Sequence, residues 1–95
     1  AQPVLGGLLT TALLGSLDPA NPFHRELAGT ALAYLDHGQR LRSTAEALHL
    51  HPNTVRYRLD RLAELTPLAL AENGGRVLDA VRSWWALHRW LDAPG

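Results

Sequence analysis

Apolar residues recur along this chain at the three-to-four-residue spacing of amphipathic helices, and no segment alternates as a strand would. Proline suits the first turn of two of these segments, at Pro22 and Pro52, and Asn21 can cap the first of the two. Gly38 can end that helix in the left-handed conformation, whereas Thr66-Pro67 stops a later one. The sequence therefore predicts an all-α, five-helix domain, with helices at about 4–14, 22–36, 41–48, 52–65 and 76–91.

The segment 41–65 combines two short helices with a tight turn, which is the layout of a helix-turn-helix. Ala45 stands where the two helices would cross closely, so only a small side chain fits there. Val55, Leu59 and Leu62 fall on one stripe of the second helix and can pack back onto the first. In this motif the second helix enters the major groove of DNA.

The rest of the fourth predicted helix carries hydrogen-bonding and cationic side chains. Its N-terminal part would go deepest into the groove, so we expect base contacts from Asn53, Arg56 and Tyr57. Phosphate contacts are expected from Thr54, Arg58, Arg61, His51 and Arg42. His51 can instead cap the helix, and Arg58 lies near the buried stripe and can reach back along the protein. Taken singly, each residue also fits an ordinary solvated helix face.

The length of 95 residues and the hydrophobic content of 46% fit one small domain. We expect residues 1–95 to form a single domain with a compact core at about 17–91, and residues 1–16 to be a leading helix that serves as a linker or dimerisation element. The formal net charge is zero, but residues 40–61 carry five Arg against Glu46 and Asp60, a local charge of +3. DNA binding needs such a local basic face rather than a basic total.

Other chemistries find little support. The chain has no cysteine, its five histidines lack metal-site spacing, and no catalytic or phosphate-binding motif is present. We therefore expect no metal, no cofactor and no enzymatic activity. No apolar run approaches a membrane span and no signal peptide is visible, so a cytoplasmic location without membrane contact is expected. The first residue is Ala, which suggests a piece of a longer protein.

The string A-x-x-L-H-x-H-P-N-T-V-R-Y-R-L-x-R-L-x-x-L-T, residues 45–66, resembles the C-terminal helix-turn-helix domain of PucR-type transcriptional regulators, which include sugar-diacid regulators of the CdaR kind. The resemblance extends over about 17–90, through similar lead-in and closing helices. It implies a DNA-binding output domain that follows a larger N-terminal effector-sensing region, which is absent here. Thr54 and Arg58 belong to the shared signature, so the resemblance leaves open for both a structural role, in capping or in holding the turn, beside DNA contact. The sequence departs from the family pattern in two places. Arg40 and Arg42 stand where family members often have a small polar capping residue, and Pro67 stands where they usually have Gly.

Three Trp residues lie on the fifth predicted helix, whose wide apolar face holds Val77, Leu78, Val81, Trp84, Trp85 and His88. We expect Trp84 to close the core, together with Leu87 or Leu91, and at least one indole to serve a dimer contact. The leading helix either packs on the fifth helix or pairs with its copy. The main hypothesis is a homodimer that binds double-stranded DNA sequence-specifically. The alternative is a dimerisation or protein-interaction module with a degenerate DNA face, for which Trp90 is the predicted test position.

Overall fold

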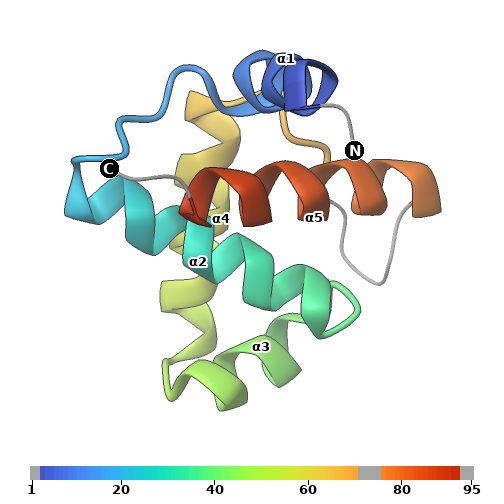
Figure 1. Cartoon of the computed structure of the whole chain (residues 1–95). Coiled ribbons are helices and arrows are strands. Elements are labelled where there is room, and N and C mark those ends of the chain that lie inside the picture. Colours follow the sequence, from blue (N-terminus) through green and yellow to red (C-terminus); the bar gives the residue numbers. More distant parts are fainter. Residues whose placement is uncertain (1–2, 71–75, 93–95) are drawn as a thin grey trace.

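The computed structural model describes residues 3–70 and 76–92, and within these residues the chain forms helices and no strand (Figure 1). The all-α prediction is confirmed, and the three middle helices have the predicted bounds. The last helix is displaced by one residue from its predicted position. The helices are α1 (Pro3–Leu14), α2 (Pro22–Asp36), α3 (Leu41–Leu48), α4 (Pro52–Leu65) and α5 (Val77–Asp92).

Helix α2 is the central element, since it packs against α3, α4 and α5 (Figure 1). Its start is fixed by Asn21, whose side-chain oxygen accepts hydrogen bonds from the backbone amides of Phe23 and His24 at 2.9 and 3.3 Å. Such a cap pairs amides that the helix itself leaves unpaired. The helix ends as predicted, with Gly38 in the left-handed region at φ 67°. Gln39 follows it at φ 58° and is buried.

The core lies where α2, α4 and α5 meet, and the end of α1 closes it. Leu14 and Leu17 are buried in the same cluster as Leu27, Leu62 and Leu87. Helix α1 packs on α5 (Figure 1), which is the first of the two arrangements considered for it.

Helix α5 is turned differently from our prediction. Its buried residues are Ser83, Ala86, Leu87 and Trp90, whereas Trp84 and Trp85 keep 39% and 40% of their surface exposed. The assignment of Trp84 to the core is therefore wrong, and Trp90 is a core residue rather than a test position for an interface. The small Ser83 and Ala86 allow a close approach of α5 to the rest of the domain, and the wider apolar face points outward.

The outward face of α5 is an apolar surface defined by Val77, Leu78, Val81, Trp84 and Trp85, all of them exposed. The Trp84 indole N–H donates to the Asp36 carboxylate at 2.9 Å, so its polar edge is paired with α2. The Arg89 guanidinium lies 5.7 Å from the ring centre of Trp85. Across the described ranges, no helix is long and apolar enough to pass through a bilayer.

Candidate nucleic-acid interface

Helices α3 and α4 are joined by a tight turn. His49 ends α3 in the left-handed conformation at φ 56°, and the Leu50 amide bonds back to the Ala45 carbonyl at 2.9 Å. Ala45 is 2% exposed, as expected for a residue at a close helix crossing. The N-cap of α3 is Arg40, which makes no side-chain cap bond, consistent with the loss of a small polar residue there. The segment thus has the geometry of a helix-turn-helix.

The first turn of α4 is held by His51 and Pro52. The Nδ1 atom of His51 accepts a hydrogen bond from the Asn53 amide at 3.0 Å, which is the capping role considered for this residue. Pro52 occupies the first helical turn, where its missing N–H leaves no bond unmade. The N-terminal end of α4 is therefore capped by a contact within the chain itself.

The outer face of α4 presents side chains to solvent. Asn53, Arg56 and Tyr57, the predicted base-contacting residues, are all exposed, and Tyr57 keeps 59% of its surface accessible. Together with α3, the start of α4 lines an open groove. Its polar lining residues are Arg42, Glu46, His49, His51, Asn53 and Arg56. Of the predicted residues, Arg42, His51, Asn53 and Arg56 thus come together at this groove, and His49, which was not predicted, lines it as well.

Two further predicted residues stand apart from that groove. Arg61 is exposed and its Nη1 lies 2.7 Å from Oε1 of Glu64, one turn further along α4. An exposed pair of this kind contributes little and is easily exchanged for another anion. Thr54 is half-buried, and its amide bonds to the His51 carbonyl at 2.9 Å within the first turn of the helix.

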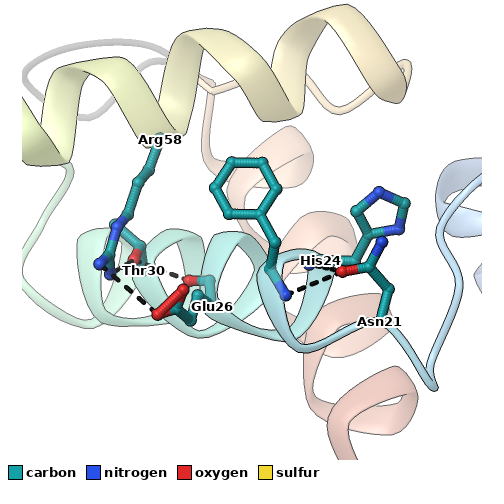
Figure 2. A network of polar contacts seen from close by, with 6 residues as sticks. Asn21, His24, Glu26, Thr30 and Arg58 are labelled. Carbon is teal, nitrogen blue, oxygen red and sulfur yellow. Dashed lines mark hydrogen bonds and ion pairs between the residues drawn. The ribbon is translucent and has the colours of Figure 1, made fainter.

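Arg58 points away from the solvent face and toward α2 (Figure 2). Its Nη1 donates to Oγ1 of Thr30 at 3.1 Å, and its Nη2 lies 3.8 Å from Oε2 of Glu26. The side chain is 21% exposed. Of the two roles considered for Arg58, the geometry favours the one that reaches back along the protein. Sequence reasoning missed its partners, and Thr30 gave little signal, because a helical Thr hydroxyl can also bond to the carbonyl four residues earlier, as Thr30 does to Glu26.

The histidines make individual contacts rather than a cluster. The Nδ1 atom of His24 accepts from the Asp18 amide at 2.9 Å, and His88 lies 4.0 Å from Asp92. Among the residues that the structure describes, no group of three or more His, Cys, Asp or Glu side chains is placed to hold a metal ion.

Comparison with known proteins agrees with this geometry. Residues 27–88 match the family described as the PucR C-terminal helix-turn-helix domain. The chain belongs to this family. The match runs from the middle of α2 almost to the end of α5, so the PucR-type domain includes the helix-turn-helix and both helices that support it. No solved structure matches the chain at a significant level.

Relatives of this PucR-type domain occur in several bacteria. It is 38% identical to the uncharacterized protein YsfB of Bacillus subtilis over 65 residues, which are 68% of this chain and 17% of that protein. It is 43% identical to the uncharacterized protein Rv2242 of Mycobacterium tuberculosis over 58 residues, 61% of this chain and 13% of that protein. The transcriptional activator PmfR of Paenarthrobacter nicotinovorans is 33% identical over 78 residues, 82% of this chain and 16% of that protein. The match thus spans between about an eighth and a sixth of the length of these relatives.

Proposed function

We propose that this domain binds double-stranded DNA sequence-specifically, with α4 in the major groove, as the C-terminal output domain of a PucR-type transcriptional regulator. The observation that carries the proposal is the exposed cluster at the start of α4, where Asn53 and Arg56 line the groove between α3 and α4 and the neighbouring Tyr57 is exposed. Asn and Arg are the side chains that pair most readily with adenine and guanine edges. The similarity to a transcriptional activator supports the same function.

We expect phosphate contacts on both sides of these base contacts. We assign them to Arg42, His51 and Arg61, which are exposed, and to Thr54 at the first turn of α4. The amide groups at the start of α4 add a favourable position for a phosphate, because a helix N-terminus carries partial positive charge. Arg61 would exchange Glu64 for a phosphate, at little cost for an exposed pair.

Fluorescence anisotropy tests the proposal directly. A labelled pool of random 20-base-pair duplexes is titrated with the domain at several salt concentrations, and the tightest duplex is then isolated by selection. We expect affinity to fall steeply with salt, since arginines that neutralise phosphates release counterions. The double variant Arg56→Ala/Arg61→Ala should abolish binding while keeping its helical circular dichroism.

The matched control is Arg76→Ala/Arg82→Ala, which removes the same charge from exposed positions at the start of α5. This control should bind nearly as the native domain does. The proposal fails if the folded native domain shows no binding at low salt, or if both double variants lose affinity equally, because the second result would indicate a general charge effect.

A second candidate function is favoured by the exposed apolar surface of α5, and its occupant would be a second copy of this chain. Two-fold DNA sites are matched by two-fold protein dimers, so dimerisation and DNA binding are compatible. We expect Val81→Glu/Trp85→Glu to shift the domain from dimer to monomer in analytical ultracentrifugation, since both side chains are exposed and not part of the core. A native domain that stays monomeric at about 100 μM, alone and on the selected duplex, would exclude this homodimer.

A further inference from the structure

We propose that Arg58 is a positioning residue, which fixes the rotation of α4 on α2 and so aims the base-contacting side chains, rather than a phosphate contact. This inference rests on the proposed function. It assigns Arg58, Thr30 and Glu26 a joint role in sequence discrimination that acts from the inner side of the recognition helix.

Two consecutive hydrogen bonds connect Arg58 of α4 to α2 (Figure 2). Arg58 donates from Nη1 to Oγ1 of Thr30 at 3.1 Å, and the Thr30 hydroxyl donates in turn to the Glu26 backbone carbonyl at 2.8 Å. The hydroxyl proton is thereby directed along α2, which leaves an oxygen lone pair for the guanidinium. The Glu26 carboxylate at 3.8 Å adds a favourable charge.

A hydrogen bond with a fixed geometry restricts the rotation of α4 about its axis, which the apolar contacts of α4 do not do. Val55 and Leu62 are completely buried, but hydrophobic packing is non-directional, so it tolerates small rotations of a helix. The planar guanidinium bonds in a fixed geometry. Arg56 and Tyr57 directly precede Arg58, so any rotation of Arg58 about the helix axis turns them by the same angle. Base contacts tolerate only about 10–20° of misorientation.

The buried position of Thr30 argues against release of Arg58 to DNA. Thr30 is 2% exposed, and within the described residues no buried side-chain nitrogen or oxygen lacks a hydrogen-bond partner. If Arg58 swung out to a phosphate, the Thr30 hydroxyl would keep its bond to the Glu26 carbonyl but lose its donor, and Arg58 would also leave the Glu26 carboxylate. The loss of a hydrogen bond to a charged group, together with that of a nearby opposite charge, is unfavourable, so the inward arrangement is favoured.

Two substitutions of Thr30 separate positioning from packing. Thr30→Val keeps the shape and the net charge but removes the acceptor, whereas Thr30→Ser keeps the acceptor and removes a methyl group. If the bond positions α4, Thr30→Val should weaken binding to the selected duplex by about fivefold to tenfold, the loss of roughly one base contact. Thr30→Ser should bind like the native domain, even though it packs less well.

The measurement is anisotropy on two probes, the selected duplex and the unselected pool, with folding verified by circular dichroism. For Thr30→Val and Arg58→Met we expect weaker binding to the selected duplex only, and a dependence of log Kd on log salt equal to that of the native domain. Arg61→Ala, a phosphate-contact variant, should instead weaken both probes and lower that slope by about 1. Thr11→Val, at an exposed position of α1, is the control for the substitution itself.

Three results would overturn the inference. One is a folded Thr30→Val domain that binds the selected duplex as well as or better than the native domain, as expected if freed Arg58 contacts DNA. Another is a decrease of about 1 in the salt slope for Arg58→Met. The third is equal loss in Thr30→Ser and Thr30→Val. Absence of binding by the native domain itself would instead refute the proposed function, and this inference with it.

Discussion

Replacement of Leu62 by alanine tests the packing that supports α4. Leu62 is completely buried and shares a core cluster with Leu27 and Leu87, from α2 and α5. The substitution removes three carbons, which is about 2.4 kcal/mol of transfer free energy at roughly 0.8 kcal/mol per carbon. The cavity left behind raises the expected loss to about 3–5 kcal/mol. A 95-residue domain has a free energy of unfolding of only about 5–14 kcal/mol.

Urea denaturation, followed by tryptophan fluorescence, to which the buried Trp90 contributes, and by circular dichroism, measures this loss. The midpoint should fall and the slope should stay constant, which indicates a change of stability rather than of the surface exposed on unfolding. The control is Leu8→Ala, the same substitution at a position that is 63% exposed, with an expected change within about 0.5 kcal/mol. A loss below about 1 kcal/mol for Leu62→Ala would show that α4 does not rest on α2 and α5 as described.

Three further predictions concern other parts of the domain. His51→Ala should lower the free energy of unfolding by about 1 kcal/mol through loss of the α4 cap, and His51→Asn should retain most of it, as measured by thermal unfolding. Trp90→Ala should lower the free energy of unfolding by about 3–5 kcal/mol in urea denaturation because Trp90 is buried, whereas Trp85→Ala, at a position that is 40% exposed, should lower it by less than about 1 kcal/mol. Equal losses would contradict the orientation of α5. Ala45→Leu should cost about 1–3 kcal/mol and weaken DNA binding by forcing α3 from α4, and a neutral result in both assays would refute the close crossing.

Local sequence signals were enough to predict most of the fold. Asn21 and Gly38 bound α2, and Pro52 and Thr66 bound α4, because capping and backbone restriction act within a few residues of the chain. The apolar stripe of α4 that faces the core was also predictable, and Val55 and Leu62 are buried as expected. The exposed position of the predicted base-contacting residues followed from the same helical spacing.

Features that depend on tertiary contacts were harder to predict. Helix α5 has apolar residues on two faces, and the wider one holding Trp84 and Trp85 was the natural choice for the core. The closer packing of the narrow face depends on Ser83 and Ala86, and hydrophobic periodicity gives small residues little weight. The partner of Arg58 lies 28 residues away on another helix, so spacing along α4 alone left two directions open for this side chain.

The packing of α1 against α5 has a consequence for the order of folding. These helices come from opposite ends of the chain, with α2, α3 and α4 between them. Joining them closes the longest loop in the domain, and the entropy lost in loop closure increases with loop length. The contacts of α3 with α2 and α4 close only short loops, and contacts between sequence neighbours generally form fast. We therefore expect the helix-turn-helix to assemble on α2 early, while the two ends of the chain join last and limit the rate of folding.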